Sequence, residues 1–349
     1  MLLKKLIKTS SKKIGAIKIS GIASDSRKVK RGDLFFALKG KKFDGNKFAN
    51  IAVNLGAKVI ITSSKIKLKN KKLPIIKIKN VKKTLEKVCS IFYKQKPKNI
   101  IAVTGTNGKS SVADFFHQIL SLNKIKVASI GTLGVKINKK IKKSNLTSPD
   151  IISMHKELYK LKKSRIENVI IEASSHGLQQ GRLNKIDFKT GVFTNFSQDH
   201  LDYHKNMKNY LNAKLILFSQ LLKKNRNIVS DENIKEFNIL KKIAINKNLK
   251  ISSINKAMIN NFNPNDKLIG VFQKKNLLMA MAIAHLSGLS KNMINKSLKK
   301  IKNVNGRLEL IRTLSNKSKI FIDYAHTPDA LNSVLQSLKD FYKKDISIV

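Results

Sequence analysis

The chain has 349 residues, of which 42% are hydrophobic and 26% charged, proportions of a globular protein that exclude a fully disordered chain. Its length predicts two or three domains. Its apolar runs are shorter than the ~20 residues of a membrane-spanning helix, its basic N-terminus lacks the apolar core of a secretory signal, and its single cysteine, Cys89, excludes a disulfide framework and favours a reducing, cytoplasmic location.

The formal net charge of +50 comes from 71 Lys and Arg residues against 21 Asp and Glu residues. Such an excess is typical of proteins that bind nucleic acid or a membrane surface. Only seven of these cations are arginines, which favour bidentate phosphate contacts, and the lysines are spread along the chain beside Ile and Asn. We interpret the charge mainly as compositional bias and expect no specific nucleic-acid partner; a basic nucleic-acid-binding protein is the alternative.

Residues 1–96 contain short strand-like runs, LFFAL, KVIIT and LPIIKI, separated by turn residues. A helix is predicted over 81–94, because apolar residues recur there at spacings of three to four. The sequence Gln-Lys-Pro at 95–97 then interrupts the helical pattern. We therefore predict a small α/β domain that ends at residue 96.

Residues 97–305 alternate between apolar strands and amphipathic helices. A strand is predicted over 99–104 and is followed by a glycine turn and a helix, and KVASIG, NVIIEA and TGVFTNF are further buried-strand candidates. Apolar runs without alternation, separated by helices, predict a parallel sheet covered on both faces. Functional groups should then gather at the carboxyl ends of its strands.

Residues 306–349 read as a strand (KIFIDYA), a loop (HTPD), a helix (ALNSVLQSLKDFY) and a second strand (DISIV). A segment of this length is too short to bury the core of a doubly wound domain. We expect it to be the beginning of an incomplete C-terminal domain.

The strongest motif is TGTNGKSS at 104–111, between a predicted strand and a predicted helix. Its glycines let backbone N–H groups approach phosphate oxygens, and the helix N-terminus adds positive potential. Lys109 can reach terminal phosphates, and the Ser110 hydroxyl can ligate Mg²⁺. Val103 stands where the standard P-loop has its first glycine, so an ordinary glycine turn is the alternative; the strand and helix favour phosphate binding.

Two polar groups follow other strands of the same predicted sheet. Glu172 ends the strand-like run that begins at 168, and Asp199 and His200 belong to FTNFSQDHLDYH at 193–204. The carboxyl ends of parallel strands share one edge, so these side chains are candidates to hold a divalent cation beside the phosphate loop. A solvated strand end is the alternative for Glu172, and a structural role is the alternative for His200.

Two cations lie outside these motifs. Lys214 has helical spacing from Tyr210, Leu217 and Phe218, which is consistent with a surface lysine or with a desolvated lysine whose lowered pKa makes it reactive. Arg307 lies at the junction of the second and third blocks. A cation at a domain junction can clamp a transferring phosphoryl group when the domains close.

In chain order, these motifs resemble the Mur ligases, the ATP-dependent amino-acid ligases of peptidoglycan synthesis, and among them those that add a diamino acid to a UDP-muramoyl-dipeptide. The resemblance runs from about residue 20 to the last residue. It rests on SDSR at 24–27 with GDLFFA at 32–37 and Asp44-Gly45, on LTSPD at 146–150, on EASSHGLQQGR at 172–182 and on DYAHTPDAL at 323–331.

The resemblance implies an α/β fold in three parts: a UDP-sugar-binding N-terminal domain at 1–96, a central parallel-sheet, P-loop-type ATPase domain at 97–305, and the start of a Rossmann-like ligase domain at 306–349. It also implies ATP and Mg²⁺ as cofactors. The implied nucleotide-binding residues are Gly105, Thr106, Asn107, Gly108, Lys109, Ser110 and Ser111 in the phosphate loop, Asn276 at adenine and Asp323 at ribose.

The same resemblance implies the remaining roles. The implied metal ligands are Ser110, Glu172, His200 and Lys214, the last as a carbamate formed with CO₂, and the implied catalytic residues are Lys109, Lys214, His200 and Arg307. The implied binders of the uridine diphosphate end are Ser24, Ser26, Lys41, Lys42 and Phe43. The implied binders of the muramoyl-peptide end are Thr147, Ser148, Ser174, Gln180 and Arg182.

Together these features predict an ATP-dependent amide ligase that activates the D-glutamyl carboxylate of UDP-muramoyl-dipeptide as an acyl phosphate, which the amine of a diamino acid then attacks. We expect meso-2,6-diaminopimelate, the commoner diamino acid among bacteria, and a monomeric enzyme with small-molecule substrates. The alternatives are a folylpolyglutamate synthase-like ligase, against which the N-terminal block argues, and an inactive nucleotide-binding truncation. The Asp-Asn-Pro-Arg motif with which the family recognises the diamino acid does not occur, so we expect little ligase activity from these residues alone.

Overall fold

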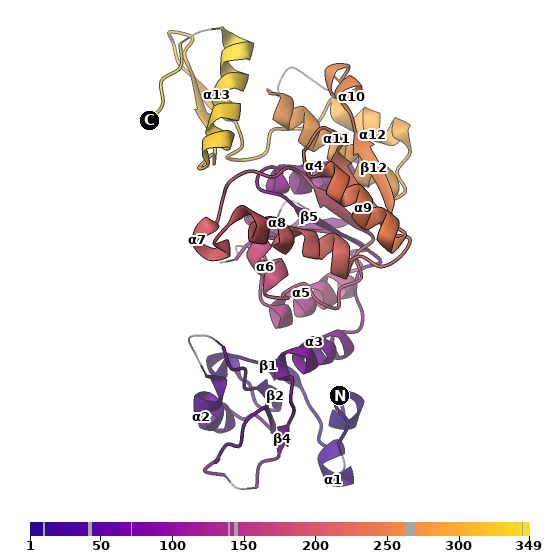
Figure 1. Cartoon of the computed structure of the whole chain (residues 1–349), viewed down its shortest axis with the longest axis vertical. Coiled ribbons are helices and arrows are strands. Elements are labelled where there is room, and N and C mark those ends of the chain that lie inside the picture. The colour runs from indigo at the N-terminus through magenta and orange to yellow at the C-terminus, as the bar shows by residue number, and fades with distance from the viewer. Residues whose placement is uncertain are drawn as a thin grey trace. The chain divides into compact units, whose positions relative to one another are not determined.

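The computed structural model describes residues 1–9, 11–40, 44–70, 72–138, 140–142, 146–262, 270–343 and 345–349. They form two compact units, each described here by itself (Figure 1). The first unit comprises residues 1–96 and 150–159, and the second comprises residues 97–149 and 160–349.

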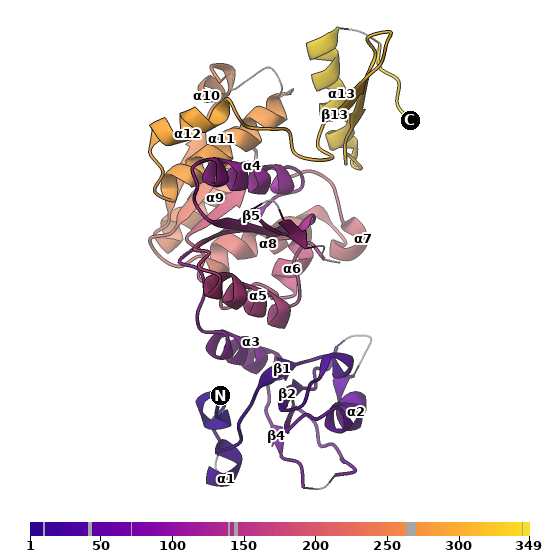
Figure 2. The same cartoon turned by 180° about the vertical axis from the view of Figure 1, so that it is seen from behind.

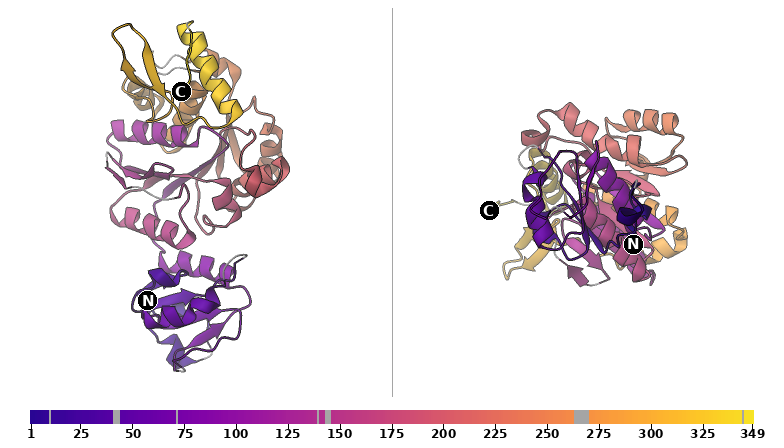
Figure 3. Two further views of the ribbon diagram at one scale, coloured as in Figure 1. Left: turned by 90° about the vertical axis from the view of Figure 1, so that its left-hand side faces the viewer. Right: turned by 90° about the horizontal axis from the view of Figure 1, so that it is seen from below.

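The first unit, whose residues 1–96 are indigo to violet in Figures 1 to 3, is built on a four-stranded parallel sheet in the order β1-β2-β3-β4. Successive side chains of a strand point to opposite faces. Leu34 and Phe36 therefore pack with Leu85 of one helix, whereas Phe35 packs with Ala52 of another on the opposite face. The elements are β1 (Gly21–Ala23), β2 (Asp33–Phe36), β3 (Val59–Thr62), β4 (Ile75–Lys77), α1 (Lys12–Gly15), α2 (Ala49–Asn54) and α3 (Val81–Phe92).

Helix α3 follows the predicted pattern. It begins after Asn80, whose side chain accepts a hydrogen bond from the backbone N–H of Lys83 at 2.9 Å. Val81, Leu85 and Val88 are buried on the face that packs on the sheet. The helix ends at Phe92, two residues before the predicted end.

The second unit contains an eight-stranded sheet in the order β12-β11-β10-β5-β9-β6-β7-β8. The six strands from β12 to β6 are parallel, and β7 and β8 continue the sheet antiparallel. The α/β class predicted from the sequence is confirmed, but the antiparallel edge was not predicted. The strands are β5 (Asn99–Thr104), β6 (Val127–Gly131), β7 (Gly134–Ile137), β8 (Lys140–Lys142), β9 (Asn168–Glu172), β10 (Thr190–Phe193), β11 (Asn227–Asp231) and β12 (Lys250–Ile254).

Helices cover the sheet of the second unit on both faces (Figure 2). Ile101 and Val103 of the central strand pack with α4 and α11, and Gly191 leaves room on β10 for Phe218 and Leu222 on the other face. The helices are α4 (Lys109–Leu122), α5 (Ile151–Lys163, shared between the units), α6 (Ser175–Gln179), α7 (Leu201–His204), α8 (Met207–Ile216), α9 (Phe237–Lys247), α10 (Lys256–Asn260), α11 (Val271–Leu286) and α12 (Lys291–Leu298), with a π-helical turn over Leu217–Leu221.

Residues after 305 form a hairpin of β13 (Glu309–Thr313) and β14 (Lys319–Ile322), followed by α13 (Pro328–Tyr342). The helix begins after Thr327, whose hydroxyl oxygen accepts from the Ala330 N–H, with Pro328 in its first turn. Strand β14 is shorter than predicted, and β13 was not predicted. The prediction of a strand over 345–349 is wrong, because these exposed residues pair with no described strand.

None of the helices in the described ranges combines the length and apolar character that crossing a bilayer requires.

We predict that Leu120→Ala lowers the free energy of unfolding of the second unit by about 2–5 kcal/mol, because Leu120 is fully buried where α4 packs on the sheet. Leu122→Ala on the same helix is the control, since that side chain is 39% exposed and its truncation should cost about 0.5 kcal/mol or less. Urea denaturation followed by circular dichroism measures both. Equal losses would contradict this description of the core.

Candidate functional site

The loop between β5 and α4 has a backbone that requires its glycines. Gly105 has φ +145° and Gly108 has φ +83°. A Cβ on Gly105 would lie 1.9 Å from Thr194 Oγ1, and one on Gly108 would lie 2.5 Å from Asn276 Oδ1. Side chains therefore cannot be accommodated at either position, and the loop leads into the N-terminus of α4, where backbone N–H groups favour an anion.

The segment after β10 holds this loop in place. Thr194 Oγ1 donates to the Asn107 carbonyl at 2.5 Å, and the Asn107 N–H donates to Asn195 Oδ1 at 2.8 Å. The Thr106 N–H donates to the Asn195 carbonyl at 3.0 Å, and the Thr106 hydroxyl exchanges hydrogen bonds with the backbone of Ser197. The sequence predicts a functional polar cluster over 193–204, but it does not predict that Thr194 and Asn195 brace the phosphate loop.

Two lysines converge on the loop from different helices. Lys109 Nζ donates to the carbonyls of Gly105 and Thr106 at 3.0 and 2.6 Å, and Lys214 Nζ donates to the same Gly105 carbonyl at 2.7 Å. Burial lowers the pKa of both amines, that of Lys214 most strongly. Lys214 is 1% exposed and lies 4.1 Å above the Tyr210 ring, so the interpretation as a surface lysine is wrong.

Glu172 lies beside the start of α4, at the end of β9. Ser110 Oγ donates to its Oε2 at 2.8 Å, and Thr132 donates its N–H to Oε1 at 3.1 Å and its hydroxyl to Oε2 at 3.2 Å. The side chain is 3% exposed, which excludes a solvated strand end. A Cβ on Gly131 would lie 1.9 Å from Oε1, so the neighbouring strand leaves space for this carboxylate and no more.

His200 lies at the rim of the same cavity. It has φ +53°, its Nε2 is 3.4 Å from Asp199 Oδ2, and its ring packs edge-on against His176 at 4.9 Å. Burial is the largest cause that lowers the pKa of His200, so the neutral imidazole is favoured. Tyr210 also packs against this ring and donates its hydroxyl to Thr106 at 3.3 Å.

These groups surround one cavity of about 160 Å³. No cluster of three His, Cys, Asp or Glu side chains suited to a metal occurs in the described part of the chain. The donors present are instead a carboxylate, Glu172, and a hydroxyl, Ser110, at the N-terminus of a phosphate-binding helix. This set fits Mg²⁺, which is held in proteins by few side chains together with phosphate oxygens and water.

Arg307 joins the cavity from the segment that leads to β13. Its Nη2 donates to Ser110 Oγ at 3.4 Å, and its guanidinium lies 4.7 Å from the centre of the Tyr324 ring. Asp323 fixes this segment, because its two oxygens accept the N–H groups of Leu308 and Ala325 at 2.6 and 2.7 Å. The structure thus brings Arg307 to the edge of the sheet where Ser110 and Glu172 lie.

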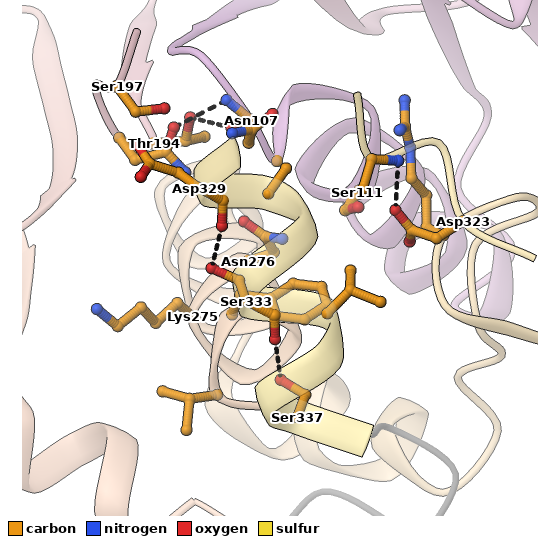
Figure 4. Close-up of a pocket in the computed structure, with 18 of the residues that line it drawn as sticks. Asn107, Ser111, Thr194, Ser197, Lys275, Asn276, Asp323, Asp329, Ser333 and Ser337 are labelled. Carbon is orange, nitrogen blue, oxygen red and sulfur yellow. Dashed lines mark hydrogen bonds between the residues drawn. The ribbon is translucent and has the colours of Figure 1, made fainter. Parts of the chain in front are cut away.

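A second cavity, of about 490 Å³, opens beside the phosphate loop (Figure 4). Asn276 on α11 borders it and approaches Gly108, while α13 forms another wall with Asp329, Ser333 and Ser337. At its base Lys275 Nζ lies 2.7 Å from Asp231 Oδ2, an ion pair that the sequence analysis missed. A cavity of this size next to a phosphate loop suits a nucleoside.

Comparisons with known proteins agree with this geometry. Residues 18–93 match the Mur ligase family, catalytic domain, and residues 103–267 match the Mur ligase middle domain. A UDP-N-acetylmuramoyl-L-alanyl-D-glutamate--2,6-diaminopimelate ligase of Rickettsia montanensis is 40% identical over an alignment that covers 94% of this chain and 72% of the relative. The chain belongs to the Mur ligase family. It is therefore an ATP-dependent ligase, and the resemblance inferred from the sequence is confirmed.

Other relatives define how far this similarity extends. A ligase of the same name from Chelativorans sp. is 35% identical and is covered to 74% of its length. A solved structure with that name superposes with a TM-score of 0.80 at 28% identity, covering 97% of this chain and 74% of the other. A folylpolyglutamate synthase of Mycobacterium tuberculosis has a TM-score of 0.58 at 16% identity over 72% of this chain and 68% of its own, which shows a shared fold alone.

In this Mur ligase, the residues predicted to bind the muramoyl-peptide form one network beside Glu172. Arg182 donates through Nε and Nη2 to Gln180 Oε1 and through Nη1 to the Ser148 carbonyl at 2.7 Å. Ser148 Oγ donates to the Glu172 carbonyl and accepts the Ser174 N–H. The Thr147 hydroxyl lies 3.1 Å from that of Thr132. The exposed Tyr203 accepts a hydrogen bond from Gln180; it lies in the polar stretch 193–204, where no role was predicted for it.

The residues predicted at the uridine end lie in the first unit or outside the described residues. Ser24 follows β1, and Ser26 begins a 3₁₀ turn and is 7% exposed. Asp25, between them, caps this turn by accepting the Arg27 N–H. Lys41, Lys42 and Phe43 are outside the described residues.

We predict that Gly131→Ala weakens ATP binding in the presence of Mg²⁺ about tenfold, because the new methyl group must displace the Glu172 carboxylate. Gly288→Ala is the control: its new Cβ has no neighbour within 4 Å, and its φ of +99° makes its backbone cost the larger of the two, so a weaker affinity in Gly131→Ala alone cannot come from backbone strain. Isothermal titration calorimetry with ATP, with and without Mg²⁺, measures both variants. A Gly131→Ala protein with unchanged affinity would contradict the assignment of Glu172 to the metal.

Proposed function

We propose that the chain joins a diamino acid, meso-2,6-diaminopimelate, to the D-glutamyl carboxylate of UDP-N-acetylmuramoyl-L-alanyl-D-glutamate through an acyl phosphate. The observation that carries the proposal is the hydrogen bond of the phosphate-loop Ser110 to the buried Glu172, in a cavity that Lys109, Lys214 and Arg307 also border. The names of the relatives support the choice of substrates.

The chemistry explains why ATP is required. A carboxylate does not react with an amine near neutral pH, because its leaving group would be oxide. An oxygen of the glutamyl carboxylate attacks the γ-phosphorus of ATP, and the bond from that phosphorus to the bridging oxygen of ADP breaks. The amine nitrogen then attacks the acyl carbon of the resulting acyl phosphate. Phosphate leaves with the bonding electron pair, and the nitrogen releases a proton to solvent.

The residues of the chain perform the positioning that phosphoryl transfer demands. Backbone N–H groups at the start of α4 and Lys109 hold the phosphates, and Arg307, through its guanidinium, offsets charge on the transferring group. Ser110 and Glu172 would hold Mg²⁺, and His200 borders the same cavity. A Mg²⁺ ion held by these residues would supply positive charge that offsets the charge of the phosphates.

Lys214 has the surroundings that carbamate formation requires. A lysine reacts with CO₂ only as the neutral amine, and burial with Lys109 nearby lowers the pKa of Lys214 well below its ordinary value. The product, an anionic carbamate, would offset the positive charge of Lys109 and Arg307 and offer oxygen atoms to Mg²⁺. We therefore assign Lys214 as a carbamylated metal ligand.

We assign the remaining parts of the chain by the same proposal. Residues 1–96 bind the uridine diphosphate end with Ser24, Ser26, Lys41, Lys42 and Phe43. The network of Arg182, Gln180, Ser148, Ser174 and Thr147 binds the muramoyl-peptide beside the metal. Asn276 binds adenine and Asp323 binds ribose; both border the larger cavity. The residues of the second unit named here would bring the glutamyl carboxylate and the γ-phosphate to one edge of its sheet.

An isotope experiment tests the reaction. UDP-muramoyl-dipeptide labelled with ¹⁸O in the D-glutamyl side-chain carboxylate is incubated with Mg·ATP, diaminopimelate and an excess of the chain, because little activity is expected from these residues alone. The small amount of phosphate released should carry ¹⁸O. UDP-N-acetylmuramoyl-L-alanine, which lacks the carboxylate, should release none, and L-lysine should be a poorer acceptor than diaminopimelate. Amide formation with unlabelled phosphate would contradict the acyl phosphate, and failure to bind the labelled substrate with Mg·ATP would contradict the proposed function.

A second prediction concerns Lys214. With ¹³C-bicarbonate at pH 8.5, carbon NMR of the wild-type chain should show a carbamate signal that Lys214→Ala abolishes. The signal should fall as the pH is lowered, because protonation of the amine below its pKa removes the nucleophile. Lys247→Ala is the control, since burial also lowers the pKa of Lys247, far from the cavity. A signal that persists in Lys214→Ala would refute this assignment.

A further inference from the structure

Arg307 lies in a strained segment of backbone. Gly306 has φ +65° and the buried Leu308 has φ +48°, a conformation that is rare for a branched apolar residue. Such strain persists only where surrounding contacts hold it, and it is typical of functional sites. The orientation of Arg307 therefore depends on the groups that hold the backbone on either side of it.

Three side chains hold this backbone. Glu309 accepts the Gly306 N–H at 2.6 Å, and Asp323 accepts the Leu308 N–H at 2.6 Å. On the opposite side, Gln273 Nε2 donates to the carbonyl of Arg307 itself at 3.1 Å. Within the described residues, the Arg307 carbonyl accepts its hydrogen bond from Gln273.

The Gln273 side chain is buried and, among the described residues, makes one hydrogen bond, the one to the Arg307 carbonyl. Its side chain is 1% exposed, and its Oε1 finds no hydrogen-bond partner in the described part of the chain. A buried amide that uses one of its two polar atoms is costly, so its placement calls for a role. Gln273 lies in the first turn of α11, one turn before Asn276, which borders the nucleoside cavity.

We propose that Gln273 is a positioning residue that fixes Arg307 for the γ-phosphate and couples that contact to the nucleoside end of the site through α11. Helix α11 packs along α4, whose N-terminus follows the phosphate loop, so the two ends of the nucleotide contact one rigid pair of helices. The inference rests on the proposed role of Arg307 at the γ-phosphate.

Nucleotide binding tests the inference without requiring turnover. We expect the wild-type chain to bind Mg·ATP more tightly than Mg·ADP, and Arg307→Ala to remove this preference. Gln273→Met keeps the length of the side chain but removes the donor, so it should weaken Mg·ATP about tenfold while Mg·ADP stays within about twofold. The double variant should lose no more than Arg307→Ala alone, because both changes act through the same guanidinium.

Gln118→Met is the matched control. Gln118 also holds the backbone of the segment that precedes Arg307. It donates a hydrogen bond to the Lys302 carbonyl at 3.0 Å and accepts one from the Lys302 N–H at 2.9 Å. It should lower stability without changing the ratio of ATP to ADP affinity. If Gln273→Met does not fold, Gln273→Glu replaces it, because this variant also removes the donor and keeps the length of the side chain. Retained ADP binding in either variant shows that the site is intact.

The outcomes separate the two proposals. A wild-type chain that binds neither nucleotide contradicts the proposed function itself. A wild-type preference that Arg307→Ala removes and Gln273→Met leaves unchanged overturns the positioning role alone. Equal losses of ATP and ADP affinity in both Gln273 variants, or additive losses in the double variant, also overturn that role, because they would show a merely structural residue.

Discussion

The hydrogen bond between Ser110 and Glu172 is the contact on which the rest of the site depends. Val103, just before the phosphate loop, pairs in the sheet with Glu172, so the register of β5 and β9 places the carboxylate beside the first turn of α4. Thr132, after β6, adds two hydrogen bonds from the next strand. Three consecutive strands of the sheet thus fix one carboxylate, and a hard cation held there lies next to any phosphate on the loop.

The electrostatic balance of this site follows from that arrangement. Lys109, Lys214 and Arg307 border the same small cavity as Glu172 and Asp199. Burial lowers the pKa of both lysines, which means that the protein alone does not compensate their charge fully. Triphosphate binding would supply the missing negative charge. The same argument gives the net charge of +50 little meaning for function, because the cations that matter are three side chains that border one cavity, and Lys214 among them is fully buried.

Local sequence was sufficient for the parts of the site that lie on continuous motifs. The phosphate loop, Glu172 after a strand and the stretch around His200 carry their own signatures of glycine spacing, apolar runs and clustered polar groups. Helix α3 was predictable for the same reason, since its period and its Asn80 cap are local. The resemblance to the Mur ligases added roles for Lys214 and Asn276, whose isolated positions indicate little by themselves.

Contacts between a side chain and a distant backbone were not predictable. Thr194 and Asn195 brace the phosphate loop from almost ninety positions away, and the polar cluster in which they lie does not show that they contact it. The Asp231–Lys275 pair is similarly hidden. The strand expected over 345–349 failed for a related reason: a strand requires a partner, and alternating or apolar residues do not reveal whether one is present.

Gln273 shows why such contacts matter most where the backbone is strained. Arg307 precedes β13 and is followed by the left-handed Leu308, and its carbonyl accepts a hydrogen bond from Gln273 of another element. From the sequence, a polar residue in the first turn of a helix is expected to face solvent. Gln273 is instead buried, and its side chain contacts the Arg307 carbonyl. The position of the Arg307 guanidinium therefore depends on a residue of α11 as well as on neighbours in sequence such as Glu309.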